Sequence, residues 1–580
     1  MSATDSPNAR VAMASQARPA LGGRPFAFPA TGSLTVQHVA LGSVIGLGFF
    51  LRLLASVRLS PHLDEASSIL AAQAAAAHGW PIFPSGTVYF QGATLSWLLM
   101  PLVWLGYGTL DQLDLLRFPI VLIGTLAVYL CYRLGLAVLG DPRIALAMAA
   151  LVAIDPSSVQ WSGHVRMYAP LQALTVALAL ALVPMFGHVA DFPSATADQS
   201  VRRDDDGPRD PLRSGRQPYT TRPGAGWRRL GVVVALFWLA VFTHVGAALL
   251  LPAMGLAFLL IHRRMLWRRL DLLATLALCA LAPLMLLTLN RVLGAASVES
   301  RDTSSKPWSF VGDNLLQPLG RIQRGFTLDV METLGRTSQV IGLIVAAATL
   351  IAAWQSSRLS GERARRVALG LLCLYWVPVV TTGVFTVYPK ERYFLHLHTL
   401  GYLFVAWLVV RQARGAGALL VRFAPAVGVT VAIVLVLLVR LANPVVQPDY
   451  HAAMAWVESH QEPGEPVIVA RPAIGYLGLD ETRRADLVYL AGSEDQPRSR
   501  RYTRLTSDGE LIDYWVGIDA IVTTDGLRRF LEANPDAWIV LDEGHLTAPL
   551  AYGGEIEQVL REMTRVVHRT PGGGLVLRAT

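Results

Sequence analysis

The sequence has little charge and few cysteines. Only 16% of its 580 residues are Asp, Glu, Lys or Arg, and 53% are hydrophobic, whereas soluble globular chains carry charge at about a quarter of their positions. The three cysteines, Cys131, Cys279 and Cys373, lie far apart in apolar stretches, which excludes a disulfide framework and a cysteine-based zinc motif. A zinc-protease His–Glu spacing is also absent. No metal site or cofactor is predicted, and metal dependence stays open.

What the sequence does contain is a series of apolar stretches, most of them about 17 to 23 residues long. At 1.5 Å per residue, helices of this length cross a hydrocarbon core of about 30 Å. We therefore predict an α-helical polytopic membrane protein with eleven spans, at residues 36–57, 116–138, 144–160, 168–186, 229–243, 245–261, 271–290, 338–354, 367–386, 394–410 and 421–441.

The arginines set the orientation of these spans. The net charge is +8, but the arginines cluster in short connections between apolar stretches, a pattern that orients a membrane protein rather than binding nucleic acid. With a cytoplasmic N-terminus, the inside connections contain Arg143, the arginines from Arg202 to Arg229, Arg263, Arg264, Arg268, Arg269, Arg358, Arg363, Arg365, Arg366, Arg411 and Arg414. Every predicted inside connection then satisfies the positive-inside rule.

One apolar stretch, residues 89–107, conflicts with this orientation if it is counted as a span. It would invert every later loop and place the arginines outside. Tyr89, Trp97, Trp104 and Tyr107 favour a helix that lies in the outer membrane interface instead.

The chain divides into three predicted parts. Residues 1–33 form a disordered cytoplasmic tail, and residues 34–442 form the transmembrane domain, with a flexible cytoplasmic loop at 187–228. Residues 443–580 have the composition of a small soluble α/β domain, with a helix at 449–459 and the strand-like segments VIVA, ADLVYLAG, DAIVTTD, AWIVLDEG and GLVLRAT. An odd number of spans places this domain outside the cytoplasm.

Two adjacent acids, Asp64 and Glu65, follow the first span in the segment RLSPHLDEASSIL. A structural role explains them, because Asp is a preferred N-cap and Glu in the first turn complements the helix dipole. A catalytic role also explains them, with one carboxylate taking the proton of an attacking hydroxyl group. Neighbouring residues on a helix point about 100° apart, so the two acids would differ: Asp64 as base, Glu65 in an orienting or substrate-binding role.

Cations and aromatic residues are predicted at the same membrane level. The segment IDPSSVQWSGHVRMYAPLQAL contains His164, Arg166 and Tyr168, and TVYPKERYFLHLH contains Lys390, Glu391, Arg392 and Tyr393. Cations here would bind a phosphate and stabilise the charge on a leaving group. The alternative is that the arginines extend to lipid headgroups.

The histidines of the outer loops are ambiguous. His244 lies at a tight outward turn between two spans, where a hydrogen-bonded structural histidine is more common than a ligand. His62, His396 and His398 allow the same two interpretations. We include His244 among the candidate substrate-binding residues.

Taken together, these segments resemble the C-type glycosyltransferase superfamily (GT-C). Within it they are most similar to the bacterial branch of protein O-mannosyltransferases, aminoarabinose transferases and Rgt-type lipopolysaccharide sugar transferases. The resemblance covers roughly residues 35–440, is densest at 60–185, and rests on HLDEA, LLRFPIVLIGTLAVYLCYRLG, DPSSVQWSGHVRMY and KERYF.

The resemblance implies a cell-membrane glycosyltransferase. Such enzymes transfer a sugar from a polyprenyl-phosphate donor to a protein, lipid or glycan on the outer face of the membrane, typically with inversion. It assigns the catalytic acid of the first outer loop to Asp64, with Glu65 beside it. Aminoarabinose transferases have a lysine-proline pair and a second aspartate where this chain has Gln91-Gly92 and Met167-Tyr168. The Arg-Met-Tyr form is closer to the Rgt-type branch.

Two other functions are compatible with a polytopic chain of this kind. A transporter or flippase of lipid-linked sugars would also have outward-facing charge, although the spans hold few ionisable residues and no paired broken helices are evident. A non-catalytic envelope protein would act through its C-terminal domain.

Overall fold

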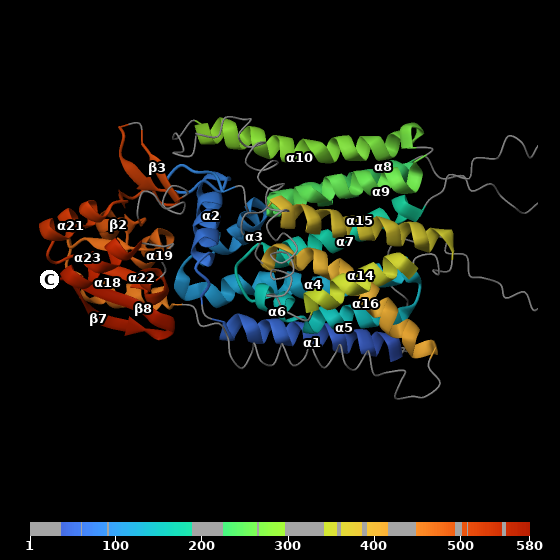
Figure 1. The fold of residues 1–580 in the computed structure, drawn as a ribbon, viewed down its shortest axis with the longest axis horizontal. Coiled ribbons are helices and arrows are strands. Elements are labelled where there is room, and N and C mark those ends of the chain that lie inside the picture. Colours follow the sequence, from blue (N-terminus) through green and yellow to red (C-terminus); the bar gives the residue numbers. More distant parts are fainter. Residues whose placement is uncertain are drawn as a thin grey trace, which may run out of the picture.

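A computed structural model describes residues 36–59, 61–89, 92–187, 224–263, 266–295, 341–355, 361–385, 391–415, 448–492, 502–506, 508–547 and 553–580. These residues form a helical bundle with a sheet-containing unit at one end (Figure 1). The predicted tail at 1–33 and most of the loop predicted at 187–228 lie outside the described residues.

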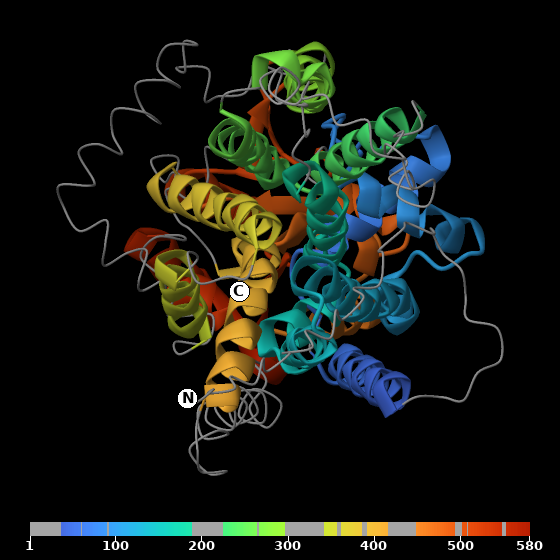
Figure 2. The ribbon, with the colours of Figure 1, turned by 90° about the vertical axis from the view of Figure 1, so that its right-hand side faces the viewer.

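Six helical segments within the described ranges are long and apolar enough to cross a membrane. They are α1 (Val36–Arg58), η1 with α4 (Leu110–Gln112 and Leu113–Leu139), α7 (Tyr168–Gly187), η3 with α9 (Val245–Leu249 and Leu250–His262), α10 (Leu270–Ala295) and α15 (Glu362–Phe385). Three more helices coincide with predicted spans: α8 (Gly224–Thr243), α14 (Ile341–Gln355) and α16 (Leu395–Gly415). Figure 2 shows these helices side by side, viewed along the bundle. The chain is a mostly helical, multi-pass membrane protein, and the predicted span 421–441 lies outside the described residues.

The predicted span at 144–160 is divided in two. Helix α5 (Pro142–Ile154) and helix α6 (Pro156–Ser162) are bent by 58° relative to each other. Pro156 cannot donate a backbone hydrogen bond to α5. The Asp155 carboxylate starts α6 by accepting from the backbone N–H groups of Ser157 and Ser158, at 3.3 and 3.0 Å. Pro156 is the signal in the sequence that could have revealed this break, because a proline inside a helical stretch commonly ends or kinks the helix.

Arg52 of α1 stabilises this break. Its side chain is fully buried and donates to the backbone carbonyls of Val152 and Ala153 at 3.0 and 3.2 Å, and to Ser158 Oγ at 2.7 Å. These carbonyls end α5, where Pro156 and the cap leave them without helical donors. Arg52 replaces those donors inside the bundle.

Two short helices lie in the first outer loop. Figure 1 shows α2 (Glu65–His78) running across the end of the bundle rather than along it. Helix α3 (Ala93–Trp104) has 12 residues, too few to cross a bilayer, and lies where an interfacial helix was predicted. Its Trp97 and Trp104 indole N–H groups each donate, at 3.0 Å, to the backbone carbonyls of Gly79 and Ala76, which fastens α3 to the end of α2.

The C-terminal unit is built on a six-stranded sheet with the order β5-β2-β1-β6-β8-β7. The strands are β1 (Val467–Val469), β2 (Leu487–Leu490), β5 (Ala520–Ile521), β6 (Trp538–Asp542), β7 (Thr564–Thr570) and β8 (Gly574–Ala579). The first four in spatial order are parallel, and β8 and β7 are antiparallel. All five strand-like segments of the sequence are strands here.

Helices cover both faces of this sheet. One face packs against α18 (Tyr450–His460) and α19 (Pro472–Gly478), and the other packs against α21 (Thr524–Ala533) and α23 (Gly553–Met563). The remaining short elements are β3 (Thr503–Leu505), β4 (Leu511–Asp513), η8 (Arg483–Asp486), α22 (Glu543–Thr547) and η9 (Pro571–Gly573). The result is a three-layer α/β unit.

This unit contacts the first outer loop directly. Apolar residues of α18, α19 and one sheet face form a continuous core with residues of α2, α3 and α4. The Ser85 backbone N–H and hydroxyl donate to the carbonyls of Trp515 and Tyr514, at 3.3 and 2.6 Å. Arg504 donates to the Thr87 hydroxyl, and His451 lies 2.9 Å from Asp111. The loop before α3 is therefore held by residues of the C-terminal unit.

Replacing Arg52 with methionine tests the broken helix. Methionine fills the space but leaves the carbonyls of Val152 and Ala153 and the Ser158 hydroxyl without their donor. We expect the free energy of unfolding to fall by about 2–4 kcal/mol. The buried thiols of the three cysteines allow unfolding to be followed with a thiol-reactive fluorophore. Arg133→Met on α4, where the side chain contacts Tyr129 of the same helix, is the control. Equal losses in the two variants would contradict this role of Arg52.

Candidate active site

The site begins at the first residues of α2. Asp64 occupies the N-cap position, but its side chain makes no capping hydrogen bond. The Asp64 side chain is instead 39% exposed and turned toward other outer segments. Asp64 therefore does not have the capping role that the sequence allows.

Two arginines from distant parts of the chain pair with Asp64. Arg166 lies in the loop between α6 and α7, and Arg392 lies in the short helix η7 (Glu391–Tyr393). Their Nη2 atoms are 3.5 and 3.4 Å from Asp64 Oδ2. The fold thus brings together residues 64, 166 and 392, as the topology argument predicts.

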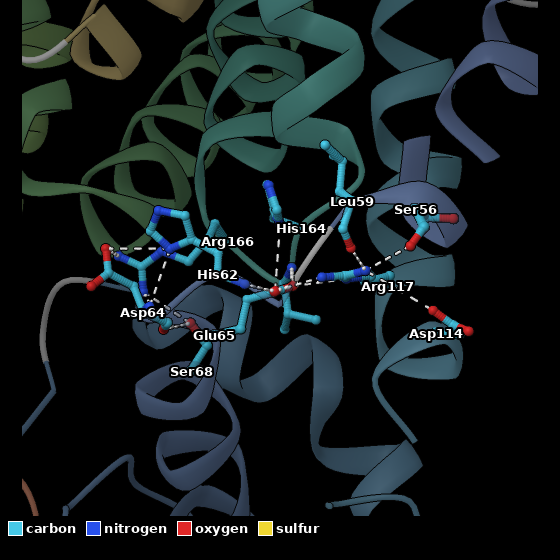
Figure 3. A network of polar contacts seen from close by, with 11 residues as sticks. Ser56, Leu59, His62, Asp64, Glu65, Ser68, Asp114, Arg117, His164 and Arg166 are labelled. Atoms are coloured by element: carbon cyan, nitrogen blue, oxygen red, sulfur yellow. Dashed lines mark hydrogen bonds and ion pairs between the residues drawn. The ribbon is translucent and has the colours of Figure 1, made fainter. Parts of the chain in front are cut away.

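Arg166 is held firmly as well as paired. It is 6% exposed, and its Nη1 donates to the Asp64 carbonyl at 2.8 Å, to Ser68 Oγ at 3.1 Å and to Tyr89 OH at 3.4 Å. Figure 3 shows its side chain beside Asp64 and Ser68. The sequence suggested Tyr89 as an interfacial anchor, but its hydroxyl contacts Arg166.

Aromatic rings surround Arg392. Its guanidinium carbon lies 5.4 Å from the Trp161 ring centroid, 5.5 Å from that of Tyr168 and 5.9 Å from that of Tyr393. Such cation–π contacts hold a guanidinium group without neutralising it. Arg392 therefore keeps its charge for an anion, which in this structure is the Asp64 carboxylate.

His244 completes this aromatic wall. Its ring centroid lies 6.0 Å from that of Tyr168 and 5.9 Å from that of Tyr393. Its Nδ1 accepts the backbone N–H of Gly246 at 3.0 Å, and burial, followed by Arg166 and Arg392, lowers the pKa of His244 to about 4. His244 is a neutral, hydrogen-bonded residue in contact with the site.

Glu65 has a different environment from its neighbour. It is fully buried and accepts two hydrogen bonds from Arg117, from Nε at 3.0 Å and from Nη2 at 2.7 Å. The backbone N–H groups of Val165 and His62 also donate to it, at 2.6 and 2.7 Å, and His164 Nδ1 lies 3.4 Å away. Figure 3 shows these partners converging on one carboxylate. Glu65 ties the first outer loop to α4 and to the segment before α7.

Both carboxylates are ionised at neutral pH. Burial, the largest single influence, raises the pKa of Asp64, but its charged neighbours, Arg166 first among them, together hold that pKa well below its usual range. Burial likewise opposes ionisation of Glu65, and His164 and Arg117 lower its pKa more strongly. Asp64 differs in being reachable from solvent.

The His62 ring is held beside Asp64 by a hydrogen bond. The backbone N–H of Asp64 donates to His62 Nδ1 at 3.1 Å, so that nitrogen carries no proton. Burial is the largest cause that lowers the pKa of His62 to about 3. The ring is therefore neutral, with its proton on Nε2, and it orients the backbone of Asp64.

The structure thus brings together most of the predicted site. Five predicted residues cluster around Asp64 through ion pairs and ring contacts: Arg166, Tyr168, Arg392, Tyr393 and His244. Glu65 and His164 contact each other beside this cluster. Lys390 lies outside the described residues. Within the described ranges, no group of three or more His, Cys, Asp and Glu residues is placed to hold a metal ion.

Sequence reasoning missed Arg117, Ser68 and the contact made by Tyr89. Arg117 lies near the start of a predicted span, in LLRFPIVL. An arginine at such a position requires a buried partner, and the adjacent outer loop offers two acids. That signal could have identified the Arg117–Glu65 pair.

Glu65→Gln tests the buried pair. Glutamine places an amide NH₂ where an oxygen now accepts, so one of the surrounding donors would face another donor. We expect a loss of about 3–5 kcal/mol in unfolding free energy, as for other broken buried ion pairs. Thiol-accessibility unfolding measures this loss. The same change at exposed Glu562 should have little effect, and a wild-type melting curve for Glu65→Gln would rule out the role assigned to Glu65.

The neutral state of His62 predicts a pH dependence. Because its folded pKa is below its unfolded value, the unfolded chain binds the proton more tightly. The stability contribution is complete above about pH 6.5 and is lost as pH falls toward 3. Between pH 7.5 and 5, wild type should lose about 1–2 kcal/mol more than His62→Gln. Denaturant unfolding at both pH values measures the difference, and parallel losses would show that His62 is not buried neutral.

No family model matches the sequence, and no curated protein matches it. Solved structures match nearly the whole chain. ArnT from Cupriavidus metallidurans in the apo state is 14% identical, with a TM-score of 0.55, and the match covers 93% of this chain and 97% of that one. ArnT bound to undecaprenyl phosphate has the same identity and coverage and a TM-score of 0.54. The archaeal oligosaccharyltransferase AglB from Archaeoglobus fulgidus, in complex with an inhibitory peptide and a dolichol-phosphate, is 12% identical, with a TM-score of 0.51 over 94% of this chain and 74% of that one. The chain therefore has the fold of the GT-C glycosyltransferases.

Proposed function

We propose that this chain is a membrane glycosyltransferase that transfers a sugar from a polyprenyl-phosphate donor to an acceptor hydroxyl, with inversion, at the outer face of the cell membrane. One observation carries the proposal. Asp64 presents a solvent-reachable carboxylate that does not cap its helix, and it lies between two arginines from separate outer segments. The acceptor hydroxyl would belong to a protein, a lipid or a cell-envelope glycan.

The proposed step divides the work between the carboxylate and the arginines. The acceptor oxygen attacks the anomeric carbon while Asp64 takes the hydroxyl proton. The bond from that carbon to the phosphate oxygen breaks, and its electron pair stays on the phosphate. Arg166 and Arg392 bind the phosphate and stabilise the growing charge. Tyr168, Tyr393 and His244 line the space beside the sugar, and the step includes no further cofactor.

Donor binding would also activate the base. With both arginines paired to Asp64, the carboxylate is a weak base. A donor phosphate competes for the same guanidinium groups and draws them away from Asp64. The pKa of Asp64 then rises toward its ordinary value, so its ability to accept a proton grows when the donor is in place.

We assign Glu65 a positioning role within this mechanism. Its oxygens are occupied by Arg117, two backbone N–H groups and His164, so it has no free oxygen for a substrate. The predicted substrate-binding role of His164 becomes support of Glu65. Known structures of this fold bound to undecaprenyl phosphate and to a dolichol-phosphate support the lipid class of the donor.

The proposed topology places the site at the outer face of the membrane. Eleven spans and a cytoplasmic N-terminus put residues 34–442 in the membrane as the catalytic domain and residues 443–580 outside the cytoplasm. Helices α2 and α3 and the sheet lie at one end of the bundle (Figure 1). Arg143, Arg263 and Arg363 lie at helix ends that the positive-inside rule assigns to the cytoplasm.

Asp64→Asn tests the proposed base. Asparagine keeps the shape but cannot accept the proton, so transfer should fall by about 10²–10⁴-fold, the usual contribution of a general base. The readout is mass spectrometry of lipid-linked sugars. We expect the donor to accumulate in cells lacking the protein, to be consumed when wild type is restored, and to remain when Asp64→Asn is supplied instead.

Asp536→Asn is the matched control, since this exposed carboxylate lies in the C-terminal unit and serves no step of the mechanism. Thiol-accessibility unfolding verifies that Asp64→Asn is folded. Consumption of the donor by Asp64→Asn at the wild-type rate would remove Asp64 as the base. Absence of any accumulating lipid-linked sugar would contradict the proposed function as a whole.

A further inference from the structure

The sheet of the C-terminal unit has a topological switch point beside the membrane site. From β1 the chain continues to β2 and then to β5 on one side, and it returns to β6 on the other side of β1. The two strands that flank this switch, β1 and β6, are parallel. In open α/β sheets, ligands bind outside the carboxyl ends of the strands at such a point.

Arg471 lies at this switch point. It follows β1 by two residues and directly precedes α19. Helix α19 packs against α2, where Ala473 and Ile474 share an apolar core with Ile69 and Leu70. Because α2 begins at Glu65, directly after the proposed base, this packing sets the helix that follows Arg471 against the helix that follows Asp64.

The electrostatics agree with this placement. Beyond burial and the nearer groups, the charge of Arg471 contributes to lowering the pKa of Asp64. Arg471 is partly buried, and its charge acts on Asp64 across the boundary between the two parts of the chain. The residue therefore belongs to the electrostatic surroundings of Asp64.

The number of cations suits the chemistry of a leaving phosphate. Glu65 pairs with Arg117, and His62 is neutral, so Arg166 and Arg392 are the arginines paired with Asp64. Arg471 adds a third positive charge to the surroundings of Asp64. A donor phosphodiester has one negative charge, whereas the released lipid phosphate has about −1.5 to −2 at pH 7. The third arginine therefore favours the product-like charge that develops as the bond breaks.

We propose that Arg471 is a substrate-binding residue that the C-terminal unit supplies to the membrane site, where it binds the phosphate of the polyprenyl carrier together with Arg166 and Arg392. This inference rests on the proposed function and deepens it. The C-terminal unit then forms part of the site. The contacts that Ser85, Arg504 and His451 make between this unit and the membrane part fix the position of Arg471 relative to Asp64.

The test measures binding of undecaprenyl phosphate to the purified full-length protein, from the rise in unfolding temperature with ligand concentration. Arg471→Gln and Arg471→Met remove the charge with two different side chains, and Arg471→Lys keeps it. We expect both neutral variants to bind about tenfold more weakly than wild type and Arg471→Lys to recover most of the affinity. Arg528→Gln, which removes an exposed arginine of the same unit, should bind as wild type does.

Arg166→Gln separates the two proposals. If wild type does not bind undecaprenyl phosphate, or if Arg166→Gln binds it equally well, the proposed function fails and this inference fails with it. If Arg166→Gln weakens binding and both neutral variants of Arg471 bind as wild type does, only the role of Arg471 is overturned. Unfolding temperatures without ligand show whether each variant retains its fold.

Discussion

The buried pair of Glu65 and Arg117 is the interaction on which the site depends. Two charges removed from water are tolerated only when their hydrogen bonds are complete, and here Arg117 and the backbone N–H groups of His62 and Val165 all converge on one carboxylate. Each partner belongs to a different stretch of chain. The start of α2, the start of α4 and the loop before α7 therefore have one relative position, and the place of Asp64 next to Arg166 follows from it. Without this pair, the segment that carries Asp64 would lose its link to the start of α4 and to the loop before α7.

The adjacent acids show how environment separates two identical functional groups. Glu65 is buried and surrounded by hydrogen-bond donors, so its charge is already paired within the protein. Asp64, one residue earlier, is 39% exposed and faces arginines that are themselves held by Ser68, by Tyr89 and by aromatic rings. The arginines are therefore positioned without depending on Asp64 alone, which is what an anion that displaces Asp64 requires. The surroundings of Glu65 fit a structural role, and those of Asp64 leave its carboxylate available for the catalytic role that we propose.

Much of this could be predicted from the sequence, and the remainder has identifiable physical reasons. Apolar length and arginine placement predict the spans, the interfacial helix and the face on which Asp64, Arg166 and Arg392 meet, because membrane thickness and charge cost act on every residue of a span. The break at Asp155–Pro156 was missed although its proline is a break signal, whereas the donors that Arg52 supplies from another helix could not be read from the sequence. That Asp64 leaves its helix uncapped was undecidable, because a cap and a free carboxylate share one sequence pattern. Arg471 could not be associated with the site before α19 was seen against α2, since no local pattern encodes that packing.

If Asp64 is the base and the two arginines bind the donor phosphate, as we propose, the charges at this centre also imply an order of events. Before a donor arrives, the arginines lower the basicity of Asp64, so an acceptor hydroxyl that binds first meets a poor base. A donor phosphate takes the arginines into its own hydrogen bonds and frees the carboxylate, and only then can the acceptor be deprotonated as it attacks. Once the sugar leaves, the phosphate gains negative charge and holds the arginines still more strongly, while the protonated Asp64 no longer attracts them. Release of the lipid phosphate therefore requires Asp64 to lose its proton and compete for the arginines again, so a single carboxylate both starts the reaction and returns the site to its resting state.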